Sequence, residues 1–322
     1  MWRKIVARKR HSQWSSDSMK PRHWIGLCAL ALLLIGCNLP PSDGSGGDTS
    51  NAPGKLAGWY SLDKAFKNPQ TRALARAAQD NNVAEVNRLM KDEHVNPDVL
   101  FSDDGARIPL VAWPVLTQSL AGLKALLDNG ANPNARDPKT KQECVGTYGC
   151  ETFPVYDNAM VYAAKVEDPA YLQELLEHGG DPNTRNVDQE SLLFGAYIWH
   201  NQWPNVQVLV EHGADINALS QGKSILYDYA SMGNFKAAYW LLQHGADPKA
   251  QYNAKADSKT RYWAIENIFW YPAEKTDFIE AQKQCQRWLL DHGIQRPPMP
   301  EHFRKQRKDL GLPYEEKDIP LP

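Results

Sequence analysis

Four histidines occupy the same place in a recurring pattern and are the first candidates for chemistry. His178, His212, His244 and His292 each stand immediately before a glycine. Imidazole is a common metal ligand and general base, so a regular row of histidines could suggest a metal site. Each of the four ends a helix-like segment, where a cationic ring suits the helix dipole, and successive ones lie a whole repeat apart. We therefore expect structural histidines and predict no metal.

The five cysteines suggest a different chemistry. Cys144 and Cys150 lie close together in a polar segment, and in an oxidising compartment they could close a small loop by a disulfide. Two unpaired thiols remain the alternative, and a metal pair is less well supported because no second pair stands at matching spacing. Cys285 occupies an apolar position of a helix, so we expect a buried, inert thiol.

Motifs for catalysis are absent from the sequence. It contains no Gly-x-Ser-x-Gly elbow, no glycine-rich phosphate loop, no Cys-x-x-Cys and no His-Glu-x-x-His. Ser191 and Ser224 stand where a residue would cap a helix. No stretch outside the repeats, tether and insertions is long enough for a catalytic domain, so we predict no enzyme activity, no catalytic residue and no cofactor.

The N-terminal region has the features of a targeting signal. Leu34, Ile35, Gly36 and Cys37 end an apolar run over residues 24–35, which is too short to cross a membrane but suits a signal peptide. The four residues resemble the lipobox of bacterial lipoproteins, which implies that Cys37 becomes the lipidated first residue of the mature chain. The alternatives are an uncleaved anchor or a chance match. We predict a signal peptide over residues 1–36, with Met19 as the true start.

Residues 37–58 are rich in Pro, Ser, Gly and Asp and are predicted to be a flexible linker. Asn38 follows the lipid site, and the lipoprotein resemblance then implies an outer-membrane anchor facing the periplasm. The whole chain has 36 Lys and Arg residues and 38 Asp and Glu residues. Residues 1–36 contain seven of the basic residues and one of the acidic ones, so the mature chain has 29 basic and 37 acidic residues and a net charge of −8. This charge argues against nucleic acid as a partner.

A five-residue phrase recurs after segments that end in paired aliphatic residues. Its copies are residues 130–134, 179–183, 213–217 and 245–249, with a degenerate fifth around Gly293. The glycines are 49, 34, 32 and 48 residues apart, and the two short spacings bracket the period of 33 residues that ankyrin repeats show.

The segments before these phrases carry the resemblance further. Residues 224–233 (SILYDYASMG) align with the Thr-Pro-Leu-His-x-Ala-Ala-x-x-Gly motif of ankyrin repeats, as do residues 158–164 and 191–197, and Ile108 begins another copy. The sequence thus resembles the ankyrin repeat family over residues 70–295. The resemblance implies an all-α fold, an ankyrin-repeat solenoid of helix-turn-helix units with hairpin-like loops, in which no unit is stable without its neighbours.

We predict about five repeats plus a divergent capping unit over residues 59–295, followed by a Pro-rich tail over residues 296–322 that either packs as a cap or is mobile. The glycine of each phrase is expected to stop a helix in a left-handed conformation, and Asp-Pro-Asn to turn the chain. Extra residues between Asp137 and Tyr156 and between Ala250 and Tyr262 are expected in loops on one face, often the binding face.

By alignment with the family, several side chains are expected to face the concave groove of the array, where partners bind. They are Tyr162, Lys165, Val166, Ile198, Trp199, Asp228, Ser231 and Met232. An exposed Trp and Met in this position would suit a protein-binding hot spot, with core packing the alternative for Trp199.

The family resemblance implies a binding module that holds another protein. Some lipoproteins of this kind are immunity proteins that neutralise secreted antibacterial phospholipases of type VI secretion, and we expect that role, with an acidic groove facing a basic patch on the toxin. The alternative is a structural scaffold of the cell envelope.

Overall fold

The computed structural model describes residues 61–98, 107–144, 150–252 and 260–322. The predicted signal peptide, Cys28, the lipid site Cys37 and the linker lie outside the described residues. Within the described ranges, no helix is long and apolar enough to span a bilayer.

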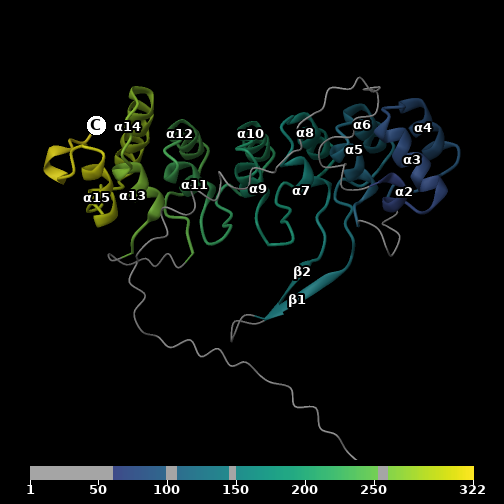
Figure 1. Ribbon diagram of the computed structural model, residues 1–322, viewed down its shortest axis with the longest axis horizontal. Helices are drawn as coiled ribbons and strands as arrows, with labels where there is room; N and C mark the ends of the chain where they lie inside the picture. Colours follow the sequence, from purple (N-terminus) through teal and green to yellow (C-terminus); the bar gives the residue numbers. More distant parts are fainter. Residues whose placement is uncertain (1–60, 99–106, 145–149, 253–259) are drawn as a thin grey trace, which may run out of the picture. The chain divides into compact units, whose positions relative to one another are not determined.

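The described residues form consecutive pairs of short antiparallel helices (Figure 1). The pairs are α3 (Pro69–Gln79) with α4 (Val83–Lys91), α5 (Trp113–Leu116) with α6 (Leu120–Asp128), α7 (Ala159–Ala163) with α8 (Ala170–Glu177), α9 (Leu192–Ile198) with α10 (Trp203–Glu211), α11 (Ile225–Ser231) with α12 (Phe235–Gln243), and α13 (Trp263–Trp270) with α14 (Thr276–Asp291). The α2 helix (Leu62–Ala65) precedes them, the 3-10 helix η3 (Leu110–Ala112) leads into α5, and α15 (Glu301–Asp309) and the 3-10 helix η4 (Glu316–Asp318) follow.

Each pair packs against the next, so the array has two rows of helices. Figure 1 shows α7, α9, α11 and α13 in one row and α8, α10, α12 and α14 in the other. Buried apolar side chains from both rows form one continuous core that extends from Leu62 to Phe303. Small residues bring the helices close: at Gly122 of α6, a β-carbon would stand 1.8 Å from the carbonyl oxygen of Ala78 in α3. The predicted all-α, ankyrin-type solenoid is confirmed.

The residues that begin and end the helices do so as the sequence predicts. The side chains of Asn158, Ser191 and Ser224 accept hydrogen bonds from backbone N–H groups three residues later, at 3.2–3.4 Å, and so cap α7, α9 and α11. The glycines that follow the second helix of a pair have φ between 75° and 93°. This left-handed conformation is energetically unfavourable for residues other than glycine.

The last residue of the repeated phrase joins each unit to the next. The amide of Asn183 donates to the carbonyl of Gly213 at 3.3 Å and accepts from the backbone N–H of Asp215 at 2.7 Å. Asn134 and Asn217 make the same two bonds to the following phrases. We call these three residues and their bonds the asparagine ladder. The fourth phrase ends in Lys249, which has no carbonyl oxygen in its side chain, so the ladder ends there.

The segment between the second and third pairs forms a two-stranded antiparallel sheet. Strands β1 (Thr140–Cys144) and β2 (Cys150–Pro154) pair Thr140 with Pro154 and, at the other end, Cys144 with Cys150. Cα atoms of opposed residues in such a ladder lie about 4.5–5.5 Å apart, within the range that a disulfide needs. The backbone thus suits the Cys144–Cys150 bond, which stays a prediction.

The tail after Arg296 packs over the last helix pair. The indole N–H of Trp270 donates to the carbonyl of Pro297 at 3.0 Å, and the Arg296 guanidinium lies 4.9 Å from the centre of the Trp270 ring. Met299 and Phe303 are buried in the core. These contacts cover the apolar end of α13 and α14, which would otherwise lack a following repeat.

Candidate binding surface

Three of the predicted groove residues are strongly exposed apolar side chains. Ile198 and Trp199 end α9 and are 49% and 44% exposed, and Met232, which ends α11, is 63% exposed. Large apolar side chains exposed at the ends of neighbouring helices often mark an interaction site. The core-packing alternative for Trp199 therefore does not hold.

The other predicted residues are less accessible. Lys165 and Ser231 are partly exposed, Tyr162 is partly buried against the core, and Asp228 is buried. Val166 corrects the prediction, since it is only 7% exposed. It closes the end of α7, where its carbonyl accepts from the amide of Asn205 at 2.7 Å, and its apolar side chain packs in the hydrophobic core.

Lysines rest on aromatic rings at this surface, and Lys223, Tyr227 and Trp263 extend it beyond the predicted residues. The Lys165 ammonium lies 5.5 Å from the centre of the Trp199 ring, and that of Lys223 lies 5.1 Å from the Tyr227 ring. Trp263 of α13 makes an edge contact with Tyr227, at 6.0 Å between centroids. Trp199 was predicted from the alignment, whereas Tyr227 and Trp263 were not.

Asp228 lies beneath this aromatic layer. Its carbonyl accepts hydrogen bonds from the hydroxyls of Tyr197 (3.3 Å) and Ser231 (2.9 Å), but its carboxylate Oδ2 is buried and has no hydrogen-bond partner among the described residues. Burial raises the pKa of Asp228 to about 7, and the nearby Lys223 only partly opposes this. Burial, aided by the Asp228 charge, also raises the pKa of Tyr197 to about 12 and that of Tyr227.

The turn beside Trp199 holds two consecutive residues in the left-handed region. His200 and Asn201 have φ of 61° and 54°, the left-handed region that costs a residue with a β-carbon about 1 kcal/mol or more. The corresponding turn after α11 uses Gly233, with φ of 73°. A hydrogen bond of 2.8 Å from the Tyr229 hydroxyl to the Asn201 side chain holds the strained turn in place.

We name the exposed part of this region the aromatic face: Lys165, Tyr197, Ile198, Trp199, Lys223, Tyr227, Ser231, Met232 and Trp263, with Asp228 beneath it. Most of these residues belong to α9, α11 and α13. Trp199 and Met232 directly follow α9 and α11, and the two lysines lie outside these helices. The arrangement offers exposed apolar area, rings that attract cations and a buried acid, and these are features of a binding surface.

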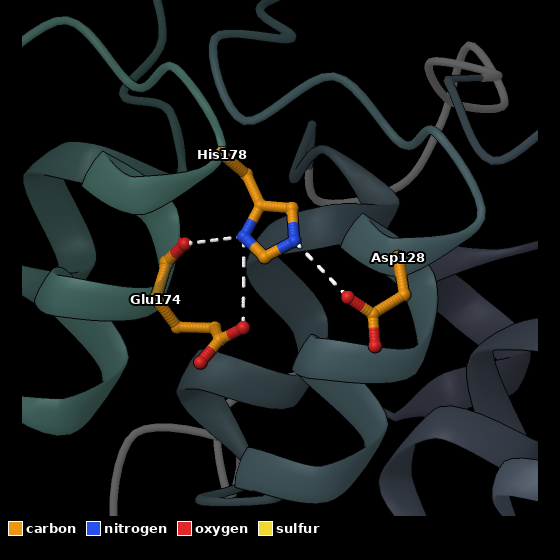
Figure 2. Close-up of side chains that lie close together, drawn as sticks. All are labelled: Asp128, Glu174 and His178. Atoms are coloured by element: carbon orange, nitrogen blue, oxygen red, sulfur yellow. Dashed lines mark hydrogen bonds and ion pairs between the residues drawn. The ribbon is translucent and has the colours of Figure 1, made fainter.

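One cluster of metal-type ligands lies in the other row of helices (Figure 2). His178 Nδ1 is 2.9 Å from the carbonyl oxygen of Glu174 and 3.5 Å from its carboxylate, whereas Nε2 is 3.2 Å from Asp128. The imidazole thus stands between the two carboxylates, with one ring nitrogen toward each. The Lys124 ammonium lies 2.8 Å from Glu174 and 3.5 Å from Asp128, so a cation already neutralises the cluster.

The remaining repeat histidines support the structural interpretation. In His212, His244 and His292, Nδ1 lies 2.7–2.8 Å from the carbonyl oxygen four residues earlier. A carbonyl only accepts, so Nδ1 carries the hydrogen and the ring satisfies a helix-end group. Cys285 is also as expected, because it is buried in α14 and burial raises the pKa of its thiol.

Comparisons with known proteins agree with this architecture. The family model described as ankyrin repeats (3 copies) matches residues 160–252. The human ankyrin repeat and SOCS box protein 6 is 28% identical over 241 residues, which are 70% of this chain and 52% of that protein. The orang-utan (Pongo abelii) protein of the same name has the same identity and coverage. The chain therefore spans about half the length of the curated relatives it matches.

Solved structures of ankyrin proteins are similar at lower identity. The ankyrin repeat domain of Bcl-3 is 22% identical, with a TM-score of 0.48 over 67% of this chain and 85% of that one. The ankyrin repeat protein EF0377 is 18% identical, with a TM-score of 0.47 over 68% and 97% of the two chains.

Proposed function

Because residues 160–252 are ankyrin repeats, which generally bind other proteins, we infer that this protein holds a partner protein on its aromatic face. The main support for the proposal is that Trp199 and Met232 are exposed at the ends of α9 and α11, the first helices of adjacent pairs. Trp is enriched among the residues that dominate binding energy, and Met adapts to irregular surfaces.

The chemistry of the described residues favours binding over catalysis. The histidines satisfy helix ends, and the cluster at His178 is an ion-pair network with Lys124. Asp228 has a raised pKa, but the neighbouring Ser231 hydroxyl donates to the Asp228 carbonyl, and the neighbours Tyr197, Tyr227 and Tyr229 all have raised pKa values. The proposed function is therefore non-enzymatic.

A photocrosslinker tests the surface directly. Benzoylphenylalanine placed at Met232 in the full chain, in cells of the source organism, is expected to give a discrete crosslinked protein. The matched control is the same group at Glu211, an exposed residue that ends α10 in the other row. Loss of the product in Trp199→Ala would support the aromatic face. Equal products from both positions, or none from Met232, would contradict the proposal.

We propose further that the protein is a lipoprotein of the bacterial envelope, anchored through Cys37 at the outer membrane and facing the periplasm. The support is the sequence Leu34-Ile35-Gly36-Cys37 after a short apolar run. Metabolic labelling with an alkyne fatty acid should mark the chain, and Cys37→Ser should abolish the label. Labelling that persists in that variant would contradict the anchor.

The role we favour within this function is that of an immunity protein for a secreted phospholipase, with an envelope scaffold as the alternative. The resemblance to such lipoproteins and the net charge of −8 after residue 36 are the support. Stoichiometric inhibition of a lipase encoded beside the gene would favour immunity. Normal lipase activity in the mixture, together with shape defects on deletion, would favour the scaffold.

A further inference from the structure

Three carboxylates are buried among the described residues, and only one of them lacks a cation. Asp137, 6% exposed, pairs with Arg107 at 2.8 Å, and Glu266, 4% exposed, receives two bonds of 2.6 Å from Arg261. Asp228, 7% exposed, has no ion-pair partner within 4 Å in the described structure, and its Oδ2 accepts no hydrogen bond. A buried carboxylate without a partner destabilises the fold. The unpaired Asp228 carboxylate therefore does not serve the stability of the protein.

Cations are already attracted to the rings around this carboxylate. Lys223 rests 5.1 Å above the ring of Tyr227 and is the charge that opposes the raised pKa of Asp228. Lys165 rests on Trp199 one repeat earlier. An ammonium or guanidinium over an aromatic ring gains more energy when water is excluded, as it is when a partner covers the surface.

Lys223 is only a partial substitute for a bound cation. Its ammonium lies over the ring, farther from the Asp228 carboxylate than the 4 Å of an ion pair, and the lysine is held on a flexible stem in the segment just before α11. It can therefore leave the ring when another cation arrives.

We propose that Asp228 is the anchor for a basic side chain of the bound partner, which takes the place of Lys223 beside Tyr227. This inference rests on the proposed function and deepens it, because it states the chemistry that the partner must present. The occupant is an arginine or lysine at the surface of a protein; the shared chemistry is a cation with N–H donors and a flat or compact head.

The test uses the full chain labelled with 5-fluorotryptophan, so that the fluorine signal of Trp263, which contacts Tyr227, reports on the site. A Trp263→Phe variant assigns the signal. The probes are N-acetyl-arginine amide, N-acetyl-lysine amide and the uncharged analogue N-acetyl-citrulline amide, each titrated at pH 8. The variants are Asp228→Asn and Lys223→Gln, with Glu211→Gln as the control for a lost surface acid.

The cationic probes should shift the Trp263 signal in a saturable way, and citrulline should not. Asp228→Asn should weaken their binding by about tenfold or more, whereas Lys223→Gln should strengthen it because the competing cation is gone. Glu211→Gln should change the affinity by less than about twofold. An equal response to citrulline, no response to the cations, or an unchanged affinity in Asp228→Asn would overturn the inference.

The two proposals fail separately. If the cationic probes give no response while Met232 still crosslinks to a partner, the assignment of Asp228 is wrong and the binding function stands. If neither is observed, both are wrong.

Discussion

Asp228 in α11 and Glu266 in α13 are buried carboxylates in adjacent repeats, and their surroundings differ in one respect. Arg261 approaches Glu266 with two guanidinium N–H groups at 2.6 Å, whereas no cation comes within ion-pair distance of Asp228 among the described residues. The pair at Glu266 holds the segment before α13 in place and serves the fold. The unpaired carboxylate lies beneath exposed rings and serves, in our proposal, a partner.

The same contrast extends to the backbone. Along the turns of the repeats, Asn134, Asn183 and Asn217 satisfy backbone groups of the next unit. Beside Trp199, the turn holds two residues other than glycine in the left-handed region. The turns after α3 and α5 each hold one such residue, Asn81 and Gln118, so the turn beside Trp199 differs from them in having two in succession. Backbone strain of this kind is often found at functional sites.

The largest expected effect comes from Asp228→Asn. The pKa of about 7 in the folded chain lies above the ordinary aspartate value of 3.8, so the folded chain binds the proton more tightly and loses stability as pH rises from about 4 to 7. The Asp228→Asn variant lacks this titration. Its free energy of unfolding should exceed that of the wild type by on the order of 3 kcal/mol at pH 8 and by much less at pH 4. Urea unfolding at both pH values measures it.

The matched change at the other carboxylate should have the opposite sign. Glu266→Gln leaves Arg261 with a weaker, uncharged acceptor, so the free energy of unfolding should fall by about 2 kcal/mol. The same urea experiment at pH 8 applies. If both substitutions shifted stability in the same direction, the distinction between the two carboxylates would be lost.

The asparagine ladder should respond at an intermediate level. Asn183→Ala removes the bonds to Gly213 and Asp215, each worth about 1 kcal/mol, and should lower the thermal midpoint. Lys249→Ala, at the equivalent position where the ladder ends, is the control and should change the midpoint far less. Comparable losses in the two variants would show that the asparagine is not the joining element.

The smallest effect concerns the strained turn. His200→Gly relieves a φ of 61° and should raise the free energy of unfolding by about 0.5–1 kcal/mol, the strain relief being partly offset by the entropy of glycine. Ser231→Gly, at a residue of helical conformation in α11, should destabilise instead. Thermal unfolding of both variants compares them.

The sequence predicted the architecture well because the repeated phrase encodes it locally. Ser191, Ser224 and the turn glycines cap and stop helices through bonds to residues only a few positions away, and these were predicted correctly. The asparagine ladder was not foreseen, since its bonds join residues about 30 positions apart.

The binding surface was predicted less completely for the same reason. Alignment placed Trp199 and Met232 at exposed positions, but it also placed Val166 there, which the end of α7 buries. The hydroxyl of Tyr197 in the preceding repeat donates to the Asp228 carbonyl, and the contact of Tyr227 with Trp263 crosses an insertion. Such contacts depend on how units stack, which spacing along one chain does not specify.

In our proposal the aromatic face, and not the opposite row of helices, holds the partner. Isothermal titration of the protein crosslinked at Met232 against the wild type, Trp199→Ala and Glu211→Ala tests it directly. We predict about a tenfold or greater loss of affinity for Trp199→Ala and a change below about twofold for Glu211→Ala. Full affinity in Trp199→Ala, with a loss in Glu211→Ala, would contradict the account.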